Sequence, residues 1–219
     1  MYRYIFLDLD GTLTDSKKGI FNCVRYALEK MGEPVPSEEV LRSFIGPPLH
    51  DSFERYCGFS RERALLGVQL FRERYTTIGK FENAPAPGKV ELCRPLKERG
   101  YVLALSSSKP EKMCEAICEK FGFTPFLTTI AGSPPAGDDW EKADVIRETM
   151  RRLELTDADR KSILMVGDRM FDVLGAKECG IDCAGVEFFG YAACGELADA
   201  GAVAVVPTAE QLETFILEQ

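Results

Sequence analysis

Residues 4–12 of the chain read Tyr4-Ile5-Phe6-Leu7-Asp8-Leu9-Asp10-Gly11-Thr12. The apolar run at 4–7 predicts a strand that is buried on both faces, as strands of parallel sheets are. Asp8 and Asp10 are two residues apart, so an extended backbone directs both carboxylates to the same side. Gly11 allows the chain to turn away and to approach a bound molecule closely. The stretch therefore predicts a parallel strand that ends in two acidic side chains.

The segment that follows this strand has the pattern of helices. Residues 19–79 contain no convincing strand, and Ser37 and Ser60 stand where N-caps would precede helices. Residues 83–88 form a cluster of helix breakers, which predicts a linker. We therefore expect an inserted all-helical domain at residues 16–82. Its expected helices span 20–31, 37–44, 48–56 and 61–78.

Beyond residue 88, apolar runs of strand length alternate with helical patterns. This alternation predicts a doubly wound parallel sheet, and hence a fold of the α/β class. The core domain would comprise residues 1–15 and 83–219, with a loop at 132–140. The expected strands are 101–106, 126–131, 162–166, 183–186 and 203–206, and the expected helices are 89–99, 110–121, 142–153, 171–179 and 209–217.

The composition is that of an ordinary globular protein and excludes several function classes. The 219 residues carry 27 basic and 35 acidic side chains, a net charge of −8, which argues against a nucleic-acid surface. No apolar run is long enough to cross a membrane, and the N-terminal run is too short for a signal peptide, so we expect a cytoplasmic protein. With eight cysteines and one histidine, we expect reduced thiols rather than a zinc site.

Acidic and hydroxyl side chains follow the expected strands. In open α/β sheets, ligands bind outside the carboxyl ends of the strands. Asp8, Asp10, Asp168 and Asp172 would converge there, which is costly unless a cation joins them, and an all-oxygen set suits Mg²⁺. Residues 106–109 offer hydroxyls, backbone N–H groups and a lysine before a helix, and so an anion site. A hard cation beside an anion pocket fits phosphoryl transfer.

Four short motifs lie in order along the chain. They are DxDGT at 8–12, a serine at 107 (or 106), a lysine at 142 and GDxxxD at 167–172. In this order they resemble the motifs of the haloacid dehalogenase superfamily. Within it, the chain is similar to the phosphoglycolate-phosphatase-like and 5'-nucleotidase-like group, whose members carry a helical cap. The resemblance spans almost the whole chain, including the helical insertion.

The resemblance implies a role for each matched residue. Asp8 would attack phosphorus and form an aspartyl-phosphate, while Asp10 would protonate the leaving oxygen and then activate water. Mg²⁺ would be held by the carboxylates of Asp8 and Asp168 and by the backbone carbonyl of Asp10. Asp172 would act through metal-bound water or by contacting the residues that bind the metal. The residues expected to hold the phosphoryl oxygens are Ser107, Lys142, Thr12 and Ser108.

For several other residues the sequence allows two interpretations. Asp172 could instead be a helix N-terminal charge, and Ser106 and Ser108 could be ordinary loop serines. Lys109 could be a solvated charge or could hold substrate, and Arg169 could reach substrate or only pair with a cap acid. In capped relatives the loop equivalent to Gly46-Pro47-Pro48 closes over the site, so these three residues are candidates for substrate selection. His50, beside this loop, is expected to be an exposed histidine without a role.

Three functions fit these residues. The leading one is a Mg²⁺-dependent phosphomonoesterase acting on phosphoglycolate, a nucleotide or a sugar phosphate, in a monomer or homodimer. The second keeps the fold but is a phosphomutase of the β-phosphoglucomutase type, in which the phosphoenzyme outlives product exchange. The third is a non-catalytic regulatory domain that binds a phosphoryl group. The presence of every motif acid disfavours this third function.

Overall fold

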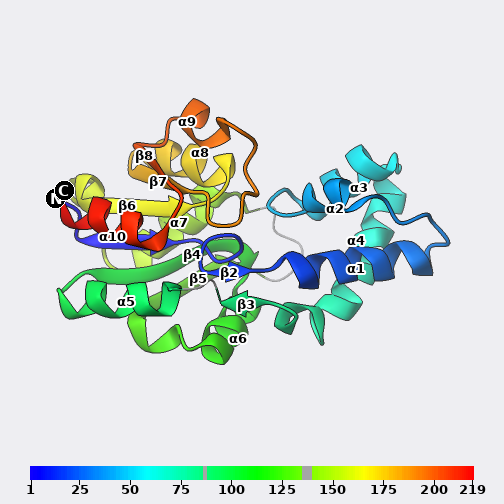
Figure 1. Ribbon diagram of the computed structural model, residues 1–219, viewed down its shortest axis with the longest axis horizontal. Helices are drawn as coiled ribbons and strands as arrows, with labels where there is room; N and C mark the ends of the chain where they lie inside the picture. Colours follow the sequence, from blue (N-terminus) through cyan, green and yellow to red (C-terminus); the bar gives the residue numbers. More distant parts are fainter. Residues whose placement is uncertain (86–87, 135–139) are drawn as a thin grey trace. The chain divides into compact units, whose positions relative to one another are not determined.

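A parallel sheet organises the larger part of the molecule. The computed structural model describes residues 1–85, 88–134 and 140–219. The sheet order is β5-β4-β1-β6-β7-β8, with parallel pairing throughout, so the predicted doubly wound α/β sheet is confirmed (Figure 1). The winding direction changes at β1, where such sheets bind their ligands. The strands are β1 (Tyr4–Leu7), β4 (Val102–Pro110), β5 (Leu127–Ser133), β6 (Ile163–Gly167), β7 (Asp182–Val186) and β8 (Ala204–Val206).

Helices cover both faces of the sheet because successive strand residues point to opposite sides. From β1, Ile5 and Leu7 pack into one hydrophobic cluster and Phe6 into another. The first cluster includes residues of α5 (Lys89–Glu98), α6 (Glu111–Phe121) and α10 (Ala209–Leu217). The second includes residues of α7 (Lys142–Arg152), α8 (Met170–Glu178) and α9 (Glu196–Ala200). The short 3₁₀ helices η2 (Thr124–Phe126) and η3 (Asp157–Ser162) precede β5 and β6.

The inserted segment is helical, as its pattern predicts. Ser37 and Ser60 are N-caps whose side chains accept hydrogen bonds from the backbone N–H groups of Val40 and Arg63. Each cap satisfies an N–H group that has no partner within its own helix, and so fixes where the helix begins. The helices are α1 (Lys17–Lys30), α2 (Glu38–Arg42), α3 (Leu49–Cys57), α4 (Arg61–Tyr75) and the 3₁₀ helix η1 (Gly79–Phe81).

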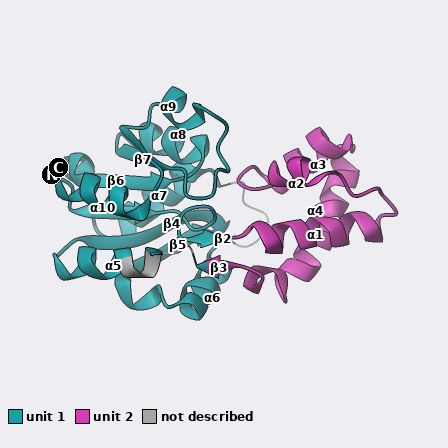
Figure 2. Cartoon of the chain, in the orientation of Figure 1, with its two compact units in different colours: residues 1–14, 85–219 teal, residues 15–84 magenta. Residues whose placement is uncertain are grey.

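The chain forms two compact units, drawn in two colours in Figure 2. One comprises Met1–Thr14 with Pro85–Gln219, and the other comprises Asp15–Ala84. The chain crosses between them at β2 (Thr14–Asp15) and β3 (Ala84–Pro85), which form a two-stranded sheet. Within the described ranges, no helix combines the length and the apolar character needed to span a membrane.

Several elements differ from the sequence-based expectation. The strand expected at 101–106 continues to Pro110, because β4 pairs again with β5 at Pro110 and Ser133 after a shift of register. The short elements β2, β3 and α9 were not expected, since two to five residues carry too little periodicity to detect. The predicted linker at 83–88 and loop at 132–140 lie partly outside the described residues, at 86–87 and 135–139.

Candidate active site

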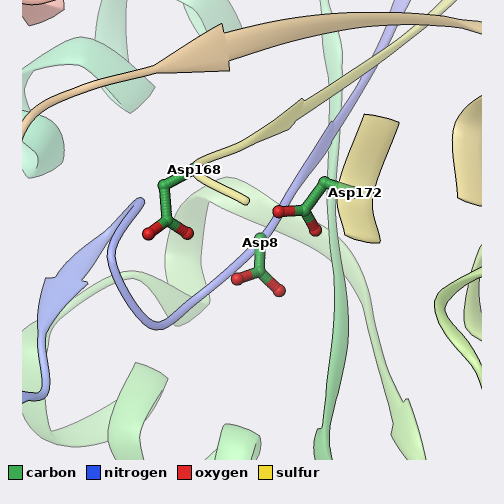
Figure 3. Close-up of side chains that lie close together, drawn as sticks. All are labelled: Asp8, Asp168 and Asp172. Atoms are coloured by element: carbon green, nitrogen blue, oxygen red, sulfur yellow. The ribbon is translucent and has the colours of Figure 1, made fainter. Parts of the chain in front are cut away.

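Three buried carboxylates meet at the carboxyl ends of β1 and β6. Asp8 directly follows β1, and its backbone N–H donates to the Val166 carbonyl oxygen at 2.9 Å, which extends the pairing of the two strands. Asp168 directly follows β6, and Asp172 lies in the first turn of α8. One carboxylate oxygen from each of Asp8, Asp168 and Asp172 lies within 4.8 Å of the others, and Figure 3 shows the three side chains gathered together. This cluster contains three of the four acids that the sequence predicts to converge at the strand ends.

Lys142, the first residue of α7, joins two of these acids. Its Nζ atom lies 2.6 Å from Asp8 Oδ1 and 2.6 Å from Asp172 Oδ1. Burial opposes the charged form of Lys142, but the carboxylates of Asp172 and Asp8 outweigh burial and raise the pKa of the ammonium. The lysine is thus a fixed positive charge beside Asp8. Asp172 therefore contacts Lys142 directly and is more than a favourable charge at a helix start.

Asp168 is the acid whose negative charge is least compensated. Burial, followed by the charges of Asp172 and Asp8, raises its pKa well above the ordinary range of aspartate. Its buried Oδ2 atom has no hydrogen-bond partner among the described residues. A buried carboxylate oxygen without a donor is costly, and a cation would satisfy it.

Two glycines allow the acids to come this close. A Cβ atom built on Gly11, whose φ is +80°, would lie 2.0 Å from Asp168 Oδ2. One built on Gly167 would lie 2.1 Å from Asp172 Cγ. Any larger side chain at either position would displace a carboxylate. The glycine of the DxDGT motif and that of the GDxxxD motif therefore both make room for the acid cluster.

Asp10 forms a second ion pair, with a lysine whose role the sequence left open. Lys109 Nζ lies 2.6 Å from Asp10 Oδ2, and the Lys109 side chain is only 8% exposed. The interpretation of Lys109 as a solvated charge is therefore wrong. The extension of β4 to Pro110, beside β1, carries Lys109 to this position.

The candidate phosphate-binding hydroxyls have different environments. Ser107 and Thr12 are buried, and Thr12 Oγ1 has no hydrogen-bond partner within the described part of the chain. Ser108 is exposed. Ser106 is a fully buried strand residue, not a loop serine, and its Oγ accepts a hydrogen bond from the Thr149 hydroxyl at 3.1 Å. Thr12 and Ser107 are thus the buried hydroxyls closest in sequence to the acids of the site and to Lys109.

Arg169 pairs with an acid that sequence reasoning did not identify. Its Nε atom lies 2.8 Å from Glu196 Oε1, at the start of α9. Glu196 also accepts hydrogen bonds from the backbone N–H groups of Met170 and Ala193. Burial opposes ionisation, but Arg169 and these donors outweigh it and lower the pKa of Glu196. No local motif marks Glu196, because its partner is 27 residues away.

The chemistry of the site fits a hard divalent cation. The site contains four carboxylates, of Asp8, Asp10, Asp168 and Asp172, and two ammonium groups, of Lys109 and Lys142. When each group has its usual charge, two negative charges remain. The donors are all oxygens, which favours ions such as Mg²⁺ over zinc. The unpartnered oxygens of Asp168 and Asp10 are available for further ligands.

The candidate loop for substrate selection lies in the unit Asp15–Ala84. Gly46 and Pro48 are exposed, Pro47 is half-buried, and Pro48 is the N-cap of α3. His50 is half-buried rather than exposed as expected, and its Nε2 atom lies 3.1 Å from Asp51 Oδ1.

All eight cysteines are free. Six are buried, and both Cys114 and Cys118 are fully buried, as their spacing on α6 predicts.

Known proteins share this fold and part of this sequence. The family model for haloacid dehalogenase-like hydrolases matches residues 4–186. A 5'-nucleotidase of Pseudomonas aeruginosa is 38% identical over 187 residues, covering 85% of this chain and 83% of that protein. The tyrosine-protein kinase PtkA of Mycobacterium tuberculosis is 34% identical over 181 residues, covering 82% of this chain and 60% of PtkA. The crystal structure of a predicted phosphatase from Clostridium acetobutylicum gives a TM-score of 0.91 at 36% identity, over 100% of both chains. The residues that the family model matches include every site residue that the sequence predicts, but not Glu196.

Proposed function

The chain belongs to the haloacid dehalogenase-like hydrolase family and is a phosphatase, and on this premise we propose that it hydrolyses a small phosphorylated metabolite by way of a phosphoryl group carried on Asp8. The observation that carries the proposal is the buried cluster of Asp8, Asp168 and Asp172, with Lys142 held 2.6 Å from Asp8. A nucleoside monophosphate is the first substrate to test, because the Pseudomonas aeruginosa relative is a 5'-nucleotidase. Phosphoglycolate and sugar phosphates are the next.

The proposed reaction has two steps. In the first, an Asp8 oxygen forms a bond to phosphorus while the bond from phosphorus to the ester oxygen breaks, and Asp10 gives that oxygen a proton. In the second, water attacks the phosphoryl group on Asp8, and Asp10 takes the proton of the water. Lys142, Ser107 and Thr12 would hold the phosphoryl oxygens, with Ser108 at their edge.

The residues at the site fit Mg²⁺. The carboxylates of Asp8 and Asp168, with the backbone carbonyl of Asp10, would hold the ion. When bound, it would neutralise negative charge on the transferring phosphoryl group. Asp172 would keep Lys142 in place, since Asp172 Oδ1 lies 2.6 Å from the lysine Nζ atom.

We propose in addition that residues 16–82 act as a cap domain whose Gly46-Pro47-Pro48 loop selects the substrate. A Pro47→Ala variant would change the ratio of kcat/KM values between two esters. An unchanged ratio across the whole panel would contradict a selective role for this loop.

A phosphate-release assay over metabolite esters tests the proposed reaction. Wild-type protein with Mg²⁺ should release phosphate, and removal of divalent cations by a chelator should abolish release until Mg²⁺ is restored. Asp8→Asn should be inactive, because a neutral amide cannot act as the nucleophile. Asp157→Asn is the matched control: its side chain is 89% exposed in the same unit, so its activity should be unchanged.

Two results would contradict this reaction. Full activity in Asp8→Asn would exclude Asp8 as the nucleophile. Isomerisation of a sugar phosphate without net release of phosphate would identify a mutase.

A further inference from the structure

We propose that Lys109 is a positioning residue for Asp10: it anchors one carboxylate oxygen so that the other exchanges the proton with substrate and water. This inference rests on the proposed function, because it assigns a partner to the acid of that reaction. Lys109 belongs to none of the four motifs. Its assignment depends on where the fold places it.

The first observation is the geometry of the pair. Lys109 Nζ lies 2.6 Å from Asp10 Oδ2, and the two side chains are 8% and 20% exposed. The other oxygen of the same carboxylate, Asp10 Oδ1, is buried and has no hydrogen-bond partner among the residues that the structure describes. The carboxylate thus has one oxygen fixed by a charge-assisted contact and one oxygen without a partner.

The second observation is the burial of the lysine. Lysine side chains are seldom buried, and holding one in a single conformation costs up to about 2 kcal/mol of rotamer entropy. Buried ion pairs contribute little net stability, because desolvation of the two charges offsets their attraction. Stability alone therefore gives no reason for a lysine here. Orientation of Asp10 gives one, since the ion pair restricts rotation of the carboxylate.

The two carboxylate oxygens of Asp10 would then have different roles. In the first step Oδ1 carries the proton and gives it to the ester oxygen as the phosphorus–oxygen bond breaks and Asp8 takes the phosphoryl group. In the second step Oδ1 removes a proton from the attacking water as the Asp8–phosphorus bond breaks, which restores the starting state. Oδ2 stays with Lys109 throughout. Lys109 itself touches neither the ester oxygen nor the water.

The test compares esters whose leaving groups differ in their need for a proton. An alkyl phosphate needs general acid catalysis, whereas p-nitrophenolate leaves without a proton. Lys109→Met should lower kcat/KM for the alkyl phosphate about 100-fold, the loss that a small misplacement of a catalytic group causes. The loss for p-nitrophenyl phosphate should be about tenfold or less. Lys109→Arg should recover most of the activity, because it retains a cation that can bind Oδ2.

A double-mutant cycle separates positioning from direct substrate binding. In an Asp10→Asn background, with p-nitrophenyl phosphate as substrate, Lys109→Met should cause no further loss. Lys112→Met, a change of an exposed lysine on α6, is the matched control and should behave as wild type. If Lys109→Met does not fold, Lys109→Gln replaces it in every arm.

Three outcomes would overturn the inference. They are unchanged kcat/KM in Lys109→Met, an equal loss on both esters, and a further loss in the Asp10→Asn background. The last two would assign Lys109 to direct substrate binding. Failure of the proposed function is distinguished from all three, because then the wild-type protein itself releases no phosphate or Asp8→Asn retains activity.

Discussion

The two compact units of this protein place their charges in opposite ways. In the unit that contains the sheet, Asp8, Lys142, Asp168 and Asp172 are all buried. In Asp15–Ala84, all of which the structure describes, no charged residue is buried, and the buried polar side chains are those of Ser16 and Ser52. Burial of a charge is costly unless it is paired or binds an ion. The difference agrees with the proposed reaction, which places its reacting charged side chains in the sheet unit.

The ion pairs of the two units should also differ in energy. Exposed pairs, such as that of Arg61 with Glu54 at 3.1 Å, contribute about 0–1 kcal/mol because water screens them. Removing one partner of a buried pair typically costs about 3–5 kcal/mol, because it leaves an uncompensated charge. Substitutions in the sheet unit should thus affect both stability and activity. Substitutions of charges in Asp15–Ala84 should affect stability slightly.

The largest effect should come from Lys142→Met. The substitution leaves the buried carboxylates of Asp8 and Asp172 without the cation that lies 2.6 Å from both. We expect the free energy of unfolding to fall by about 3–5 kcal/mol. Phosphate release should be lost as well, because Lys142 is the charge that we propose holds the phosphoryl group. Urea unfolding and the phosphate assay measure the two effects. Lys177→Met, at an exposed lysine of α8, should change stability by less than about 0.5 kcal/mol. Equal stability of the two variants would contradict the comparison.

Two glycine variants, one in each unit, should show an effect of intermediate size. Gly11 and Gly32 have similar φ angles, +80° and +69°, so alanine costs about 1–2 kcal/mol of backbone strain at either. At Gly11 the new Cβ atom would lie 2.0 Å from Asp168 Oδ2, whereas at Gly32 nothing lies within 4 Å. Gly11→Ala should therefore lose roughly 100-fold in kcat/KM because Asp168 is displaced. Gly32→Ala should lose only stability. Equal activity in both variants would show that Asp168 tolerates displacement.

Residues whose position depends on nearby sequence could be predicted, whereas residues whose partners are far away in the sequence could not. Asp8, Asp10 and Asp168 could be placed because each directly follows a strand or lies three residues beyond its end, and the sheet order brings strand ends together. The N-caps Ser37 and Ser60 were also predictable, because a cap bonds within three residues. Lys142 needed the family resemblance, since lysines at helix starts are common.

Ion pairs between residues far apart in the sequence could not be predicted. The contact of Lys109 with Asp10 depends on how far β4 extends, and a shift of register between Ser106 and Pro110 sets that length. Nothing local signals such a shift. The pair of Arg169 with Glu196 depends on α9, which has five residues and no detectable period.

The smallest effect concerns an ion pair in Asp15–Ala84 and should appear only in acid. Arg74 Nη2 lies 3.0 Å from Glu82 Oε1, and the two side chains are 20% and 22% exposed. The hydrogen bond from Arg74 outweighs burial and lowers the pKa of Glu82 below its ordinary value of 4.5. Because the folded state then binds the proton less tightly than the unfolded state, the pair stabilises fully above the unfolded pKa. This contribution is lost as the pH falls from 4.5 through the lower, folded pKa.

Glu82→Gln measures that contribution directly. The difference in the free energy of unfolding between wild type and Glu82→Gln should be about 1 kcal/mol or less at pH 7, since the pair is partly exposed. It should shrink steadily as the pH is lowered below 4.5, because both proteins then carry a neutral side chain at position 82. Urea unfolding followed by circular dichroism at a series of pH values gives the curve. Glu29→Gln, at an exposed position near the end of α1, should run parallel to wild type. A difference above about 3 kcal/mol, the size expected for a buried pair, would mean that the contrast between the two units does not hold.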